Sequence, residues 1–366
     1  MMIMGLFFKT VLQAQVVNSG VADTISGNKL GNVSIGAYMD LYYGFDFNKP
    51  KDGNIPYFVS MNRHNEANVN LAMLDVRFKS ERLRARMAPG FGTYMQANYT
   101  AESSGLRYLI EANAGVKLFK TKEIWLDFGI LGSPFTNESC VSRDHLMYTR
   151  SLAPEYVPYY LSGLKLSLPI DKKWNLYVYL LNGWQQIADQ NQGKSLGVQI
   201  EFRPDNKNLL NWDVYIGYER SASNPDYRVR YFTDLYWIYN PDGKFSLTSC
   251  AYLGIQKKES LTENDMLLWW QVNICSRYKL GRKTSVSGRL EYFNDANAVQ
   301  VTSINAAVSG LSAFGGGICL NYNLFENALV RFEGRHFYAP EKAYKSSEGK
   351  PSSIPTWLTG NLTVWF

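Results

Sequence analysis

Basic side chains crowd between positions 77 and 86 of the sequence. Arg77 and Lys79 end one segment, and Arg82, Arg84 and Arg86 begin the next. Because successive side chains of a β-strand point to opposite faces, the last three share one polar face. A row of cations inside a pore attracts anions and sets charge selectivity. The alternative interpretation is that Lys79 and Arg82 stand at a rim and extend toward lipid headgroups.

Other ionisable residues have matching parity on neighbouring segments. Arg107 and Lys117 would extend the basic face, whereas Asp40, Glu111 and Asp127 would moderate its field. We therefore hypothesise a pore wall of mixed charge with a weak preference for anions. The net charge of +6 is spread along the chain without a nucleic-acid-binding motif, so we expect no nucleic-acid partner.

Residue patterns for catalysis or metal binding are sparse. The three His are far apart in the sequence, and the four Cys include no C-x-x-C pair. Ser142, Asp144 and His145 are adjacent, but sequence neighbours in one loop rarely form a catalytic triad, and no G-x-S-x-G occurs. We expect no catalytic residues, no metal site and no cofactor.

Strict alternation of apolar and polar residues dominates the chain. From Val33 to Asn48, one face is apolar and the other is polar, over a length that exceeds the usual soluble strand of roughly 5–6 residues. Comparable segments recur to the end of the chain. We expect strands at 33–48, 68–79, 82–99, 106–119, 122–133, 159–170, 173–186, 193–203, 209–221, 226–239, 243–257, 266–280, 283–295, 312–323, 327–340 and 355–366, with bulges near Asp75 and Tyr231.

Short turns and longer links mostly alternate between these segments, as they do in transmembrane barrels with short periplasmic turns and longer extracellular loops. The pattern predicts an all-β fold, a transmembrane antiparallel up-and-down β-barrel of about sixteen strands. Both ends of the barrel would lie on the periplasmic side. We expect residues 1–14 to be a signal-peptide remnant, 15–32 an N-terminal extension and 33–366 the barrel in the cell outer membrane.

Aromatic residues stand near the expected periplasmic strand ends. Trp174, Trp212 and Trp237 would form a girdle at the headgroup level, with ordinary core packing as the alternative. The terminal Phe366 ends an alternating strand and resembles the signal read by barrel-assembly machinery. Outer-membrane lipids and that machinery are therefore the expected partners.

Two cysteines, Cys250 and Cys275, lie on adjacent expected strands with lumen-facing parity and roughly opposite positions. Two interpretations stay open. An oxidising periplasm would allow a cross-strand disulfide, or both residues fill space in the lumen as small side chains.

Two blocks of the sequence carry a family resemblance. YMDLYYGFDFNKP followed by SMNRHNEANVNLAMLDVRF, and IWLDFGILGSPFTNES followed by YTRSLAPEYVPYYLSGLKL, resemble the OmpL-like family of β-barrel porins. The resemblance implies an outer-membrane porin that passes small hydrophilic solutes through a water-filled lumen and has no catalytic residues. A substrate-specific transporter for a sugar or an anionic solute, a plugged structural or assembly barrel, and a homo-oligomer stay open as alternatives.

The link 134–158 is the longest and carries Glu138, Arg143, Asp144 and Arg150. A loop of this length without a function is unusual. By analogy with sixteen-stranded porins, we expect it to enter and narrow the lumen, with a short helix from Glu138 to Arg150. The alternative is an extracellular loop that packs over the mouth.

Overall fold

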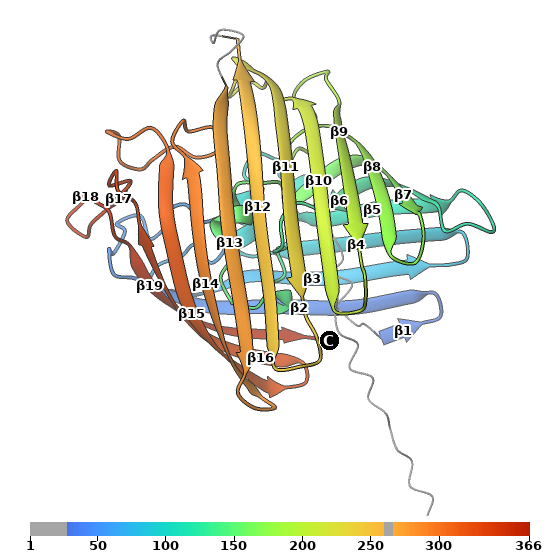
Figure 1. Ribbon diagram of the computed structural model, residues 1–366, viewed down its shortest axis with the longest axis horizontal. Coiled ribbons are helices and arrows are strands. Elements are labelled where there is room, and N and C mark those ends of the chain that lie inside the picture. The colour runs from blue at the N-terminus through green and yellow to red at the C-terminus, as the bar shows by residue number, and fades with distance from the viewer. Residues whose placement is uncertain (1–27, 260–265) are drawn as a thin grey trace, which may run out of the picture.

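Sixteen antiparallel strands close into a barrel in the computed structural model, which describes residues 28–259 and 266–366 (Figure 1). Each barrel strand pairs with the next along the chain, and β19 (Thr356–Trp365) pairs with β2 (Val33–Asp46) to close the ring. The predicted fold class is confirmed. The expected signal-peptide remnant 1–14 and most of the extension 15–32 lie outside the described residues.

All sixteen expected segments contain a barrel strand, with ends that differ by a few residues in most cases. Between β2 and β19 the wall consists of β3 (Glu66–Lys79), β4 (Leu83–Phe91), β5 (Leu109–Lys117), β6 (Trp125–Gly132), β7 (Tyr160–Pro169), β8 (Trp174–Leu181), β9 (Ser195–Phe202), β10 (Asn208–Tyr218), β11 (Tyr227–Tyr239), β12 (Phe245–Lys258), β13 (Leu267–Lys279), β14 (Thr284–Asp295), β15 (Leu311–Phe325) and β16 (Ala328–Tyr338).

The structure also contains short strands and helical segments besides the barrel strands. β1 (Asn28–Leu30) pairs with the start of β2, and β17 (Tyr344–Lys345) pairs with β18 (Pro351–Ser352) in a loop. The helical segments are α1 (Thr93–Asn98), η1 (Leu106–Tyr108), η2 (Ser142–Asp144) and α2 (Leu152–Glu155). None of the helices among the described residues is long and apolar enough to cross a membrane.

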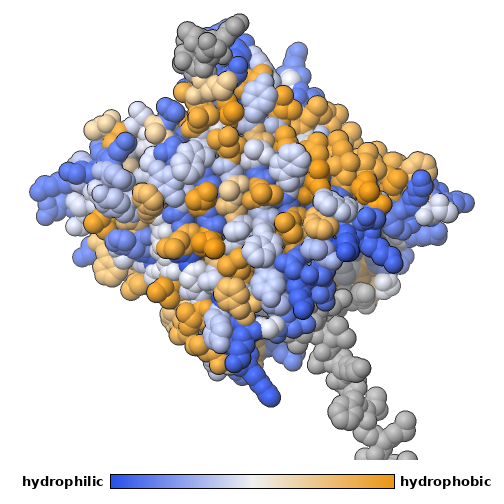
Figure 2. Space-filling view, viewed as in Figure 1, coloured by the Kyte–Doolittle hydropathy of each residue, from blue (hydrophilic) through white to orange (hydrophobic). Residues whose placement is uncertain are grey.

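Apolar side chains cover the outside of the barrel, and polar ones point inward. On β2, Met39 and Tyr43 are 46% and 44% exposed, whereas their inward neighbours Asp40 and Tyr42 are buried. Figure 2 shows hydrophobic side chains over much of the outer face. In soluble proteins apolar side chains point inward and polar ones outward. The arrangement is reversed here because the outside of the barrel faces lipid and its interior is polar.

Among the described residues four register shifts interrupt the pairing; those at Ala88/Pro89 and Asn323/Phe325 were not expected, and the other two concern the predicted bulges. Asp40 faces Leu71 whereas Leu41 faces Val69, so the bulge in β3 lies at Asn70 and not at the predicted Asp75. The second lies between Tyr227 and Arg230 at the start of β11, close to the predicted position. Each extra residue shifts the alternation by one, which explains the unclear phase in the sequence.

The expected strand 82–99 is wrong in its second half, because β4 ends at Phe91 and the chain turns inward as α1. Gly92 makes this turn at φ 131°, and a Cβ there would stand 2.4 Å from the carbonyl oxygen of Asn70. Only glycine fits such a position without strain. As a result Tyr94 and Met95 are buried inside the barrel and do not continue the wall.

Candidate functional site

The segment between β6 and β7, here called the inner loop (residues 133–159), folds into the barrel. Most of its residues are buried, and Tyr148 and Arg150 are 0% exposed. Part of it lies behind β12 and β13 in Figure 1. A continuous helix from Glu138 to Arg150 is absent from the loop, which contains only the short η2 and α2. Side chains of the barrel wall form hydrogen bonds with the backbone N–H and C=O groups of the loop, and these bonds take the place of those that a helix would make.

Three arginines of the wall hold the inner loop by its carbonyl oxygens. Arg289 of β14 donates to the Thr149 carbonyl at 2.7 Å, and Arg331 of β16 donates to the Ser142 carbonyl at 2.7 Å. Arg335 donates to the carbonyl of Arg150 at 2.8 Å. All three guanidinium groups are buried. Hydrogen bonds from a charged group are roughly twice as strong as neutral ones, so the loop is fixed against this side of the barrel.

Two glutamates of the same wall bind the loop amides. Glu333 accepts hydrogen bonds from the backbone N–H groups of Tyr148 at 2.8 Å and Thr149 at 2.9 Å. Glu291 accepts one from Leu152 at 2.6 Å and pairs with Arg335. The sequence analysis missed these anchors, although their parity on the expected strands 283–295 and 327–340 already placed charged side chains on the polar face.

Asp40 belongs to this anchoring system as well. It accepts hydrogen bonds from Tyr148 at 3.0 Å, from Ser142 at 3.1 Å and from Asn361 at 2.7 Å, and it is 0% exposed. Asp40 was expected to line the pore and moderate its field. The structure places it under the inner loop, because the loop covers this part of β2.

The four ionisable residues expected to line a constriction within the inner loop are also engaged. Glu138 accepts from the backbone of Ser151 at 2.8 Å, and Arg150 donates to the Ser139 carbonyl at 2.7 Å. The guanidinium of Arg143 lies over the ring of Trp365, at 4.4 Å from its centroid, and 3.9 Å from Asp144. These side chains face the barrel wall or the loop itself.

The opposite side of the lumen holds a cavity of about 730 Å³, here called the vestibule. Its lining comes from β2 to β8 and reaches Lys79 and Pro169 at the strand ends next to short turns. Short turns mark the periplasmic end of such barrels. Ionisable side chains that line it are Arg77, Lys79, Arg84, Arg86, Glu111, Glu123, Asp127 and Lys165.

Carboxylates neutralise most of the vestibule's arginines. Arg86 lies 2.9 Å from Asp75 and 2.7 Å from Glu111. Arg77 shares Asp75 at 2.8 Å. The vestibule wall is therefore a network of paired charges, in which Glu111 binds Arg86 directly and Asp75, whose face the sequence left unclear, binds two arginines.

Closer to the turn before β4, Arg84 binds both carboxylate oxygens of Asp127. At the rim, Lys117 lies 2.5 Å from Glu123, and hydrogen bonds from Lys117 and Trp125 hold the pKa of Glu123 below its usual value.

Two residues of the expected basic wall lie elsewhere. Arg82 is exposed in the turn before β4 and donates weakly to the Lys117 carbonyl at 3.4 Å. Arg107 lies in η1, where it donates to the carbonyls of Glu102 and Thr100. The strand that was expected to begin at 106 begins at Leu109, because η1 precedes it. Arg107 therefore lies outside the barrel wall.

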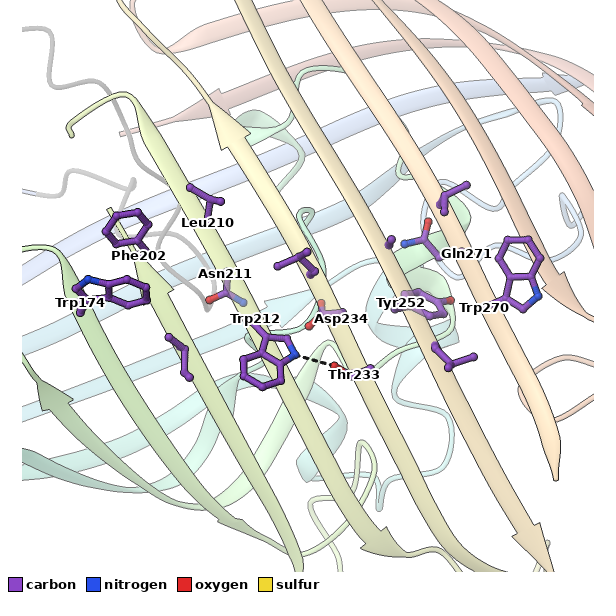
Figure 3. A pocket seen from close by; sticks show the side chains of 15 residues that line it. Trp174, Phe202, Leu210, Asn211, Trp212, Thr233, Asp234, Tyr252, Trp270 and Gln271 are labelled. Atoms are coloured by element: carbon purple, nitrogen blue, oxygen red, sulfur yellow. Dashed lines mark hydrogen bonds between the residues drawn. The ribbon is translucent and has the colours of Figure 1, made fainter. Parts of the chain in front are cut away.

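The aromatic side chains expected in the periplasmic girdle are exposed on the outer face. Trp174, Trp212 and Trp237 are 42%, 49% and 38% exposed, and Phe366 is 60% exposed. Trp174 and Trp212 border a shallow apolar groove across β8–β13, in which Trp212 donates to Thr233 at 2.9 Å (Figure 3). The carbonyl of Phe366 accepts from Ala37 at 3.0 Å, so the barrel's last residue lies beside its first strand.

The four cysteines are free and buried. Cys250 faces Asn273 and Cys275 faces Thr248, so they are not opposite each other and the disulfide interpretation is wrong.

The adjacent residues Ser142 and His145 bind separate partners. His145 accepts a hydrogen bond from the backbone of Ser139 at 3.0 Å, whereas Ser142 forms hydrogen bonds with Tyr38 and Asp40. Within residues 28–259 and 266–366, no group of three or more His, Cys, Asp or Glu could hold a metal ion.

Solved structures with the same fold are outer-membrane proteins. An anion-selective porin from Comamonas acidovorans has a TM-score of 0.58 at 7% identity, covering 91% of this chain and 99% of its own. The outer-membrane-expressed OmpT of Vibrio cholerae has 0.57 at 10%, covering 93% and 99%. Its in-vitro folded trimer form has 0.56 at 11%, covering 92% and 100%. These likenesses show the fold.

A search of curated protein sequences found no significant match. Residues 32–366 match the family described as "Putative beta-barrel porin-2, OmpL-like". The match spans the whole barrel, as the resemblance in the sequence implied. This chain therefore belongs to the OmpL-like β-barrel porin-2 family and is a porin-like β-barrel of the outer membrane.

Proposed function

We propose that the protein is a diffusion porin, in which small hydrophilic solutes pass between the inner loop and the wall formed by β3–β8. The observation that carries the proposal is the polar cavity of about 730 Å³ that the inner loop leaves along β2–β8. The loop is bound to β14 and β16 by buried charged anchors, and its Cys140 and Val141 also pack against side chains of β3–β5. A loop held in this way narrows the lumen and leaves the cavity open.

The vestibule's charges support a weak preference for anions. Five cations that line the vestibule meet four carboxylates, which leaves one positive charge. The cations are Arg77, Lys79, Arg84, Arg86 and Lys165, and the carboxylates are Asp75, Glu111, Glu123 and Asp127. Because pairing weakens the field of the arginines, the preference is smaller than an unpaired basic wall would produce.

Conductance in planar bilayers tests this function. Purified protein should give discrete ohmic steps in KCl, and the reversal potential in a KCl gradient should have the sign of a modest chloride preference. Liposome swelling with sugars of graded size should show a cut-off by size. Protein that is correctly folded but passes neither ions nor sugars would be a plugged barrel and would contradict the proposal.

Two accompanying features belong to the same proposal. The protein acts as a channel and not as an enzyme, since Ser142 and His145 bind separate partners. It forms a homotrimer, as one structural neighbour is described in a trimer form. Native mass spectrometry in detergent checks the trimer, and hydrolysis of phospholipid by the purified protein would contradict the first point.

A further inference from the structure

Lys165 of β7 differs from the three arginines of the vestibule. It is the register partner of Asp127, but Arg84 already binds both oxygens of that carboxylate. Within residues 28–259 and 266–366, no carboxylate lies within ion-pair distance of Lys165. Its ammonium lies 4.9 Å from the ring centroid of Tyr177. Among the described residues, Lys165 therefore adds a positive charge without an ion pair to the cavity lining, as Lys79 does at the end of β3.

Uncharged hydrogen-bonding groups follow Lys165 toward the rim of the vestibule. Ser167, two residues further along the inner face of β7, is the register partner of Tyr177, and Asn175 follows toward the rim opposite Pro169. All three line the vestibule. The Tyr177 hydroxyl donates to Glu201 at 3.1 Å, which orients its ring. In the described part of the chain, the side-chain amide of Asn175 has no hydrogen-bond partner, so its donors and acceptor are available to a solute.

This combination suits one class of solute. An ammonium without a carboxylate recognises a carboxylate, and a free amide and a hydroxyl recognise solute hydroxyl groups. Binding sites for small molecules combine a few convergent polar groups with an aromatic surface, which the ring of Tyr177 provides here. Phosphate would need more compensating charge than this single ammonium offers, because the neighbouring arginines are paired.

We propose that the vestibule contains a binding subsite for a small polyhydroxylated monocarboxylate, that is, a sugar acid. The proposal rests on the porin function and names a solute class that the channel retains. Lys165 binds the carboxylate, Asn175 and Ser167 bind hydroxyl groups, and Tyr177 forms the wall beside the sugar ring. A neutral sugar leaves Lys165 without its partner and binds less tightly.

Titration calorimetry on the detergent-folded protein tests the subsite, with D-glucuronate and D-glucose as probes because they differ only at the carboxylate carbon. We expect saturable glucuronate binding at least about tenfold tighter than glucose binding. Lys165→Met should weaken glucuronate binding by about tenfold or more and leave glucose unchanged. Asn175→Ala should weaken both. Lys172→Met, in the exposed turn before β8, removes the same charge outside the vestibule and should change neither.

Equal binding of the two sugars, no glucuronate binding, or an equal loss in Lys165→Met and Lys172→Met would overturn the subsite. KCl conductance of the same samples tests the porin function separately. A channel that conducts but binds no glucuronate retains the function and refutes the subsite. Binding without conductance retains the subsite and refutes the channel. Retention of the compact, heat-modifiable gel band shows that each variant is folded.

Discussion

Glu333 offers the sharpest test of how the inner loop is held. Its buried carboxylate accepts the backbone N–H groups of Tyr148 and Thr149 and lies 3.2 Å from Arg289. A hydrogen bond to a charged acceptor contributes about 1.5–3 kcal/mol, and one to a neutral acceptor about 0.5–1.5 kcal/mol. In Glu333→Gln, the two bonds together should lose about 2–3 kcal/mol of the free energy of loop opening.

The loss should be local because Arg331, Arg335 and Glu291 still hold the loop. Amide hydrogen exchange reports such local opening. Peptides containing Tyr148 and Thr149 should exchange about 30- to 150-fold faster in the variant, as tenfold corresponds to about 1.4 kcal/mol. Single-channel records should show added current noise as the loop fluctuates.

Glu326→Gln is the matched control, since Glu326 is exposed in the turn between β15 and β16. It should leave both exchange and noise unchanged. Unaltered exchange of the Tyr148 and Thr149 amides in Glu333→Gln would refute the argument that charged wall anchors hold the loop.

Three further substitutions probe the wall. Asp213→Asn removes one of two buried carboxylates at directly opposed positions, its partner being Asp234, and should raise stability by about 1 kcal/mol; a lower thermal midpoint of the folded gel band would contradict this. Gly92→Ala should destabilise the barrel by about 2–4 kcal/mol through contact with the Asn70 carbonyl and an unfavourable φ, and an unchanged midpoint in urea would refute it. The lowered pKa of Glu123 means that its contribution is present above its unfolded pKa of about 4.3 and is lost as pH falls through the folded value. Glu123→Gln should therefore lower the melting temperature at pH 7 but not at pH 3, and a difference that persists at pH 3 would argue against the ion pair.

The wall was predictable because lipid outside and polar groups inside impose a period of two on every strand. The same reasoning failed where one residue shifts the period, as at Asn70, or where glycine permits a turn, as at Gly92. In both places the cause is a backbone geometry that alternation does not encode. Parity alone placed Arg84 and Arg86 correctly on the inner face.

Charge partners were much less predictable than faces. Asp75 neutralises Arg77 and Arg86, but the bulge upstream obscured its phase in the sequence. The anchors of the inner loop join residues 185 and 189 positions apart, as between Tyr148 and Glu333 or Ser142 and Arg331. A strand pattern shows which side chains point inward, whereas the contacts across the lumen depend on how the loop enters it.

Those long separations also set an order of events during assembly. The inner loop ends before β7, but Glu291, Arg331 and Glu333 lie on β14 and β16. Contacts between distant residues form late because closing a long chain segment costs entropy. The loop therefore lacks its charged anchors on β14 and β16 until the C-terminal strands arrive and β19 meets β2. A barrel stalled before that closure would keep both an open edge and an unnarrowed interior, so the final hairpin completes the wall and the constriction together.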